Sequence, residues 1–164
     1  MIYLVSYIEE VKIGWRAYDR WMFDILDTGF GIDIHYYIPI DLQKDGDWFW
    51  SKGRGGEDKR FVADLPMLKR VLGDINYVNV QPAKVLRSLG KVGQNLTNFI
   101  HPDEDVCYIF GPNKGKIELL PGYNVYITLE KSALHASSAA AIVLYDRRAK
   151  IETGTRGWPT EKRD

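Results

Sequence analysis

Residues 101–115 read HPDEDVCYIFGPNKG, and this stretch decides the expected fold. Residues 106–110 form a short apolar run that ends at a Gly-Pro turn, which is typical of a strand buried in a sheet. A second run, NVYIT at residues 124–128, also leads into a loop. Ligands of open α/β sheets bind where strands end at their carboxyl ends. The two loops therefore indicate a ligand site, although two ordinary turns beside a tightly packed helix would give the same spacing.

Outward from this stretch, the chain alternates between strand-like and helix-like segments. The first strand, helix and strand lie within about forty residues, which predicts a parallel α/β unit. Residues 43–60 are rich in glycine and charge, so we expect an exposed loop that is long enough to carry function. The expected strands are residues 2–7, 32–40, 75–80, 106–110 and 124–128, and the expected helices are residues 12–31, 65–73, 81–90 and 133–150.

The composition predicts one soluble globular domain. The chain has 164 residues, 45% hydrophobic and 27% charged, which are ordinary values for such a domain. We expect residues 1–150 to form the domain and residues 151–164 a polar C-terminal tail. No apolar run is long enough to cross a bilayer, and the start does not read as a signal peptide. The single cysteine, Cys107, is expected in the core, and a cytoplasmic location is expected with it.

Several chemistries are disfavoured by what the sequence contains. The 22 basic and 22 acidic residues cancel, so there is no overall attraction to nucleic acid. GPNKGK lacks the spacing of a P-loop, and no G-x-G-x-x-G occurs, which disfavours nucleotide-triphosphate and nicotinamide enzymes. The three histidines and one cysteine lack the spacing of metal ligands, so no metal is expected. We expect His101 to shape the turn before its strand together with Pro102, and His35 to be structural.

Three segments in order carry a resemblance to a known family. HPDEDVCYIFGPNKG, then NVYIT, then ALHASSAAAIVLYDR at residues 133–147 resemble the C-terminal half of the SpoU/TrmH branch of SPOUT RNA methyltransferases. The resemblance implies an α/β fold, with a SPOUT-like, mostly parallel sheet flanked by helices and a C-terminal trefoil knot, a rare exception to the rule against knots. It also implies S-adenosylmethionine bound in the knot, and a homodimer.

The resemblance implies that three loops hold the cofactor. Most of these contacts would be made by backbone or apolar groups, and the small residues that begin the last helix would permit close backbone approach. The implied cofactor-binding residues are Phe110, Gly111, Pro112 and Gly115 in the first loop, Ile127, Thr128 and Leu129 in the second, and Leu134 and Ala139 in the third.

The sequence departs from the family pattern at the positions that carry chemistry. Asn113 stands where the family has an acidic residue, and His135 stands where it has an asparagine. The N-terminal arginine motif is not cleanly present. Placing Gly14 on the motif's glycine puts a tyrosine at the arginine position, with Arg16 and Arg20 two residues to either side.

Two alternatives stay open for each candidate catalytic group. By resemblance, Arg20, or failing it Arg16, would handle the acceptor hydroxyl and its proton. Arg20 could instead form only a weak surface pair with Asp24. His135 would suit a general base or a phosphate donor near neutral pH, or it could simply cap neighbouring backbone groups at the helix start.

An RNA substrate would need electropositive and aromatic surface. The long loop offers both kinds of residue, although its aromatic side chains could instead fold back onto the core. The candidate substrate-binding residues are Trp48, Trp50, Lys52, Arg54, Lys59 and Arg60.

The sequence therefore predicts an S-adenosylmethionine-dependent RNA methyltransferase that acts on ribose 2′-hydroxyls of tRNA or rRNA as a homodimer, without metal and away from membranes. One alternative is a catalytically inactive SPOUT-fold dimer that acts as a nucleic-acid or protein binding module. Another is an unrelated small α/β enzyme whose loops imitate the pattern.

Overall fold

The computed structural model describes residues 1–8, 15–39, 59–112, 116–129 and 134–154, and for residues 8, 15–20 and 59–60 it describes the backbone alone. The described strands are β1 (Ile2–Ile8), β2 (Ile34–Pro39), β3 (Lys59–Phe61), β4 (Asn76–Val80), β5 (Gln94–Asn95), β6 (Val106–Phe110) and β7 (Tyr123–Tyr126). The described helices are α1 (Trp15–Phe30), α3 (Leu65–Leu72), α4 (Ala83–Ser88) and α5 (Ala136–Glu152), with a 3₁₀ turn η1 (Leu96–Asn98).

The strands form one seven-stranded sheet in the order β3-β2-β1-β6-β4-β7-β5, and every neighbouring pair is parallel. The register puts Val5 of β1 beside Tyr36 of β2 and Ile109 of β6. The predicted parallel α/β organisation is thus confirmed. Because all strands run in one direction, their carboxyl ends meet at one edge of the sheet.

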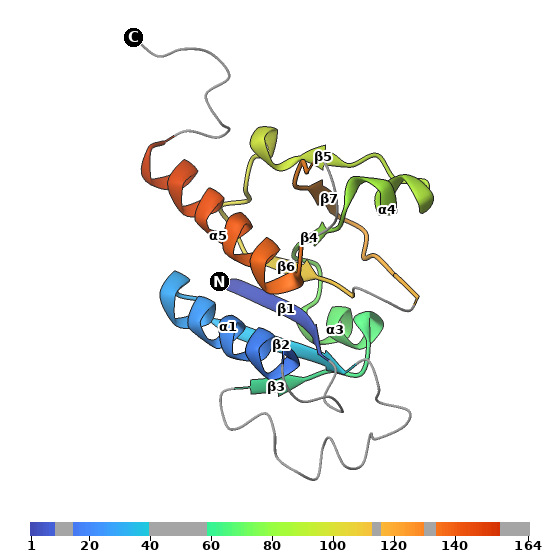
Figure 1. The fold of residues 1–164 in the computed structure, drawn as a ribbon, viewed down its shortest axis with the longest axis vertical. Helices are drawn as coiled ribbons and strands as arrows, with labels where there is room; N and C mark the ends of the chain where they lie inside the picture. The colour runs from blue at the N-terminus through green and yellow to red at the C-terminus, as the bar shows by residue number, and fades with distance from the viewer. Residues whose placement is uncertain (9–14, 40–58, 113–115, 130–133, 155–164) are drawn as a thin grey trace.

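Helices cover both faces of this sheet (Figure 1). Successive strand residues point to opposite faces, so a strand covered on both sides is apolar throughout. Leu4 and Val5 accordingly are both fully buried, in different core clusters. Helices α1 and α5 pack against each other and over the first cluster, whereas α3 covers the second. Cys107 is buried in the second cluster, as predicted, and burial raises the pKa of its thiol.

The run of small residues at the start of α5 lies against the sheet. Ala136, Ser137 and Ala140 are buried, and the two alanines belong to the same core cluster as Phe23 of α1. Side chains this small let the helix backbone approach its neighbours closely. The short residues therefore seat α5 deep in the fold immediately after the loop from which it starts.

Several element boundaries differ from those expected. Lys59 and Arg60 begin strand β3 instead of ending a loop, and the two-residue strand β5 was not predicted. Strand β7 ends at Tyr126, and α5 covers Ala136–Glu152 instead of 133–150. Strands of two or three residues are too short to show an alternating pattern, so propensity cannot reveal them. Among the described residues, no helix is long and apolar enough to cross a membrane.

Candidate cofactor and substrate site

The candidate site lies at the carboxyl ends of β4, β6 and β7, which are neighbours in the sheet. Strand β6 ends at Phe110, and Gly111 follows with a φ of 90° and a cis peptide bond to Pro112. Only glycine adopts such a positive φ readily. The turn therefore carries no side chain at its first residue.

Gln81 connects the three strand ends. It directly follows β4, and its backbone N–H donates to the Val125 carbonyl of β7 at 3.1 Å. Its side-chain Nε2 donates to the Gly111 carbonyl at 2.6 Å. Gln81 is itself buried, so these bonds fix the first loop relative to the other two strands.

Asn95 makes a similar link on the outer side of the site. Its Nδ2 donates to Thr128 Oγ1 at 2.8 Å, which ties β5 to the second predicted loop. Sequence reasoning missed both Gln81 and Asn95. Each is a polar residue at the end of a strand or directly after it. This pattern identifies a site residue only once the order of the strands in the sheet is known.

The predicted cofactor residues divide by exposure. Phe110 and Pro112 are buried, so Phe110 offers its backbone rather than its ring. Thr128 and Leu129 are exposed, and Ile127, Leu134 and Ala139 are half-buried. Gly115 lies outside the described residues.

This set of groups fits S-adenosylmethionine. Adenosine binds to apolar walls together with a few polar backbone groups. Ile127, Leu129 and Leu134 supply partly accessible apolar surface, and the turn at Gly111 supplies backbone without an obstructing side chain. The assignment of these residues to a cofactor site stays a prediction.

His135 is exposed and occupies the N-cap position of α5. Its carbonyl accepts a hydrogen bond from the Ala139 N–H at 3.0 Å, whereas its side chain makes no capping hydrogen bond. The side chain therefore does not cap the start of α5, and the catalytic role and the contact with a neighbouring loop both stay predictions.

The arginine and loop candidates are only partly described. Arg16 and Arg20 lie in the first half of α1, but their side chains are outside the described part of the chain. Trp48, Trp50, Lys52 and Arg54 also lie outside it. The backbone of Lys59 and Arg60 belongs to β3, three strands away from β6, so the structure does not bring those two residues beside Gly111.

His35 lies in a buried hydrogen-bonded group. His35 Nδ1 lies 2.6 Å from Asp27 Oδ2, and its Nε2 lies 3.0 Å from Ser6 Oγ. Ser6 and His35 are both buried beneath α1, so this chain of contacts links α1 to the sheet. This arrangement agrees with the structural role expected for His35.

His101 has a larger role than the expected turn residue. Its Nδ1 lies 2.8 Å from the Tyr108 hydroxyl, and its Nε2 lies 2.7 Å from Asp146 Oδ2 on α5. The same oxygen lies 2.8 Å from Lys150 Nζ. Burial lowers the pKa of His101 below its ordinary value of 6.5, although the hydrogen bond to Asp146 acts in the opposite direction. The signal in the sequence was an Asp and a Lys four residues apart on an otherwise apolar helix face.

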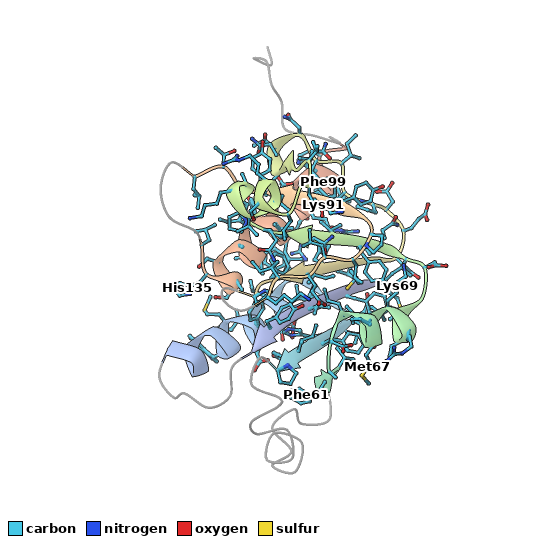
Figure 2. The ribbon with its side chains drawn as sticks, turned by 90° about the vertical axis from the view of Figure 1, so that its right-hand side faces the viewer. Phe61, Met67, Lys69, Lys91, Phe99 and His135 are labelled. Carbon is cyan, nitrogen blue, oxygen red and sulfur yellow. The ribbon has the colours of Figure 1, made fainter. Side chains whose placement is uncertain are left out.

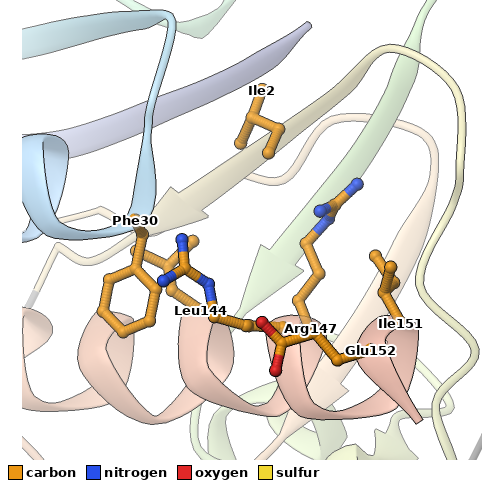
Figure 3. Close-up of a pocket in the computed structure, with 7 residues that line it drawn as sticks. Ile2, Phe30, Leu144, Arg147, Ile151 and Glu152 are labelled. Atoms are coloured by element: carbon orange, nitrogen blue, oxygen red, sulfur yellow. The ribbon is translucent and has the colours of Figure 1, made fainter.

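A separate pocket lies near the amino end of the sheet, between α1, β1 and α5 (Figure 3). It has a volume of about 160 Å³, and no predicted site residue lines it. Its lining residues are Ile2, Phe30, Leu144, Arg147, Arg148, Ile151 and Glu152. Across the described ranges, no three His, Cys, Asp or Glu side chains gather where they could hold a metal ion.

No protein-family model matches the chain, and no curated protein matches it. Solved structures do match. A candidate RNA methyltransferase from Bacillus anthracis has a TM-score of 0.60 at 15% identity, over 99% of this chain and 100% of that one. A protein studied for the 2-OH methylation of C/U34 on tRNA has a TM-score of 0.63 at 14% identity, over 93% and 97%.

The SpoU methyltransferase AviRb from Streptomyces viridochromogenes has a TM-score of 0.59 at 15% identity, over 95% of this chain but only 62% of its own. Its complex with the cofactor AdoMet has a TM-score of 0.50 at 16% identity, over 92% and 60%. At such identities the likeness concerns the fold. The resemblance to SpoU-class RNA methyltransferases is confirmed at that level: the chain has their α/β fold, a parallel sheet flanked by helices.

Proposed function

We propose that the protein is an S-adenosylmethionine-dependent RNA methyltransferase that acts on a ribose 2′-hydroxyl of tRNA or rRNA. The observation that carries this proposal is the glycine-initiated turn at the end of β6, which Gln81 joins to the ends of β4 and β7. The shared fold supports the proposal, because one similar structure concerns 2-OH methylation on tRNA and another contains AdoMet.

The cofactor would be held by backbone at Gly111 and by the side chains of Ile127, Leu129 and Leu134. When bound, it supplies an activated methyl group. We also propose that the C-terminal part of the chain forms the trefoil knot of the family, and that the protein works in the cytoplasm, where a reduced Cys107 is expected.

The remaining chemistry belongs to the chain's own residues. The acceptor hydroxyl must be positioned and its proton removed. His135 stands at the start of α5, next in the chain to Leu134, and its imidazole would accept the 2′-hydroxyl proton. Arg20, or failing it Arg16, would orient the acceptor nucleotide through its phosphate.

A homodimer is part of the proposal. Helices α1 and α5 pack side by side, and each presents exposed apolar side chains. On α1, Trp21 and Ile25 are four residues apart, and on α5, Ile142 and Tyr145 are three apart, so each pair shares a helix face. Such an apolar surface suits a second copy of the chain.

Calorimetric titration with S-adenosylmethionine tests the proposal most directly. We expect binding to the wild-type protein and none to Gly111→Trp, whereas Val71→Glu, an exposed change on α3, should bind normally. A folded protein that binds no cofactor would contradict the methyltransferase proposal. It would favour the binding module, which the departures at Asn113 and His135 already suggest as a second candidate.

A further inference from the structure

Helix α4 and the turn after it carry an unbalanced positive charge. No Asp or Glu occurs between Asp74 and Asp103, whereas Lys84, Arg87 and Lys91 fall in this interval. All three side chains are exposed. Within the described part of the chain, none of the three forms an ion pair. In a protein of zero net charge, this surface is therefore a local source of positive potential.

The turn that carries Lys91 is held firmly. Gly90 has a φ of 71°, and the Lys91 N–H donates to the Leu86 carbonyl at 2.9 Å, which closes the end of α4 in the manner of a Schellman motif. Leu86 is buried beneath it. Lys84 and Arg87 are three residues apart on the helix and share a face. The positions of the three cations are thus set by α4 and its closing turn.

This surface borders the candidate site. Helix α4 begins directly after Gln81 and Pro82, and Gln81 holds the carbonyl of Gly111. The turn after α4 packs on β7. Gly93 lies so close to Tyr126 that a Cβ added to it would be 2.9 Å from Tyr126 Cδ1. Figure 1 shows α4 beside β5 and β7, and Figure 2 labels Lys91. The cations therefore flank the loops that would hold the methyl donor.

An exposed apolar side chain accompanies the cations. Val92, next in the chain to Lys91, is 95% exposed. Single-stranded RNA is bound by cations that follow its phosphates and by apolar contacts to its bases. The surface offers both kinds of group.

We infer that Lys84, Arg87 and Lys91 form a surface, the α4 surface, that binds the phosphate backbone of the RNA substrate beside the methylation site. This inference rests on the proposed function, and it names a substrate-binding region separate from the long loop at residues 43–60. Three cations at exposed positions would add affinity without base specificity.

The test compares two double variants that lose equal charge. Arg87→Gln with Lys91→Gln removes cations from the α4 surface, and Arg70→Gln with Arg148→Gln removes exposed cations from α3 and α5. Binding of an unmodified tRNA transcript is measured by filter binding across a salt series. For two lost phosphate contacts, we expect the slope of log K against log salt to shrink by roughly 1.5 in the first variant. It should change little in the second.

Other results would overturn the inference. If the salt slope changes equally in the two double variants, or if the wild-type protein binds no RNA, the α4 surface does not bind RNA. If polyglutamate competes as well as RNA of equal charge, the surface serves an acidic protein partner instead. RNA binding that depends on the α4 surface, but without methyl transfer, would leave this inference standing and contradict the proposed function.

Discussion

At the scale of single residues, the buried group under α5 has the largest energetic consequence. Lys150 is almost fully buried, pairs with Asp146 and donates to the carbonyls of Leu96 and Phe99 at 2.7 and 2.9 Å. These bonds tie α5 to the segment that precedes β6. A buried charge that loses its partner is costly, because neither water nor another group compensates it.

We therefore expect Lys150→Met to lower the free energy of unfolding by about 3–5 kcal/mol. Urea denaturation followed by circular dichroism would measure it. The control is Lys116→Met, which removes an exposed lysine 3.6 Å from Glu118 and should cost less than about 1 kcal/mol. Similar losses in the two variants would show that the buried pair adds no stability.

The same group predicts a pH dependence. Burial lowers the pKa of His101 in the folded protein below its ordinary value of 6.5, so the unfolded chain binds the proton more tightly. The stability from neutral His101 is fully present above pH 6.5 and is lost as the pH falls toward the folded pKa. Urea midpoints from pH 8 to pH 5 should fall for the wild-type protein. His101→Gln should flatten this pH dependence. If the variant shows the same pH dependence as the wild-type protein, other titratable groups cause it.

At the scale of elements, the contact between α4 and β7 depends on one glycine. A Cβ at Gly93 would lie 2.6 Å from Leu86 Cδ1 and 2.9 Å from Tyr126 Cδ1. We expect Gly93→Ala to destabilise the protein by about 1–3 kcal/mol, because a buried leucine must shift. Thermal unfolding would measure the effect. Gly29→Ala is the control, since a Cβ there meets nothing within 4 Å and lies in a helix, where alanine is favoured. Equal effects would contradict the packing argument.

Elements with a full period of apolar residues could be predicted from the sequence, and short ones could not. Residues 106–110 were recognised as a buried strand because all five residues are apolar or aromatic, and all five are buried. Strand β5 has two residues and depends on its pairing with β7, which local propensity does not encode.

The candidate site shows the same division. The turn at Gly111 follows from a Gly-Pro pair after a strand, and a sequence pattern can reveal it. The part played by Gln81 depends on β4 lying between β6 and β7, a fact of strand order alone. Asp146 and His101 are likewise distant in sequence and meet only in the folded chain.

At the scale of the whole molecule, the exposed faces of α1 and α5 predict self-association. Tyr145→Glu with Ile142→Glu places two charges on an apolar surface and should convert the expected dimer to a monomer, measured by sedimentation velocity. Val71→Glu on α3, an equally exposed apolar position on the opposite face, should leave the dimer intact. A wild-type monomer would contradict the predicted homodimer.

The two outermost strands of the sheet bear on how copies of the chain can meet. Strand β3 has three residues and begins with Lys59 and Arg60, and β5 has two residues. Long, apolar edge strands leave rows of unpaired backbone groups that invite aggregation, whereas short or charged ones resist it. Within the described strands, the sheet therefore offers little template for strand-by-strand growth into fibrils. The proposed association between copies would then use helix surfaces, where a closed pair can form without propagating.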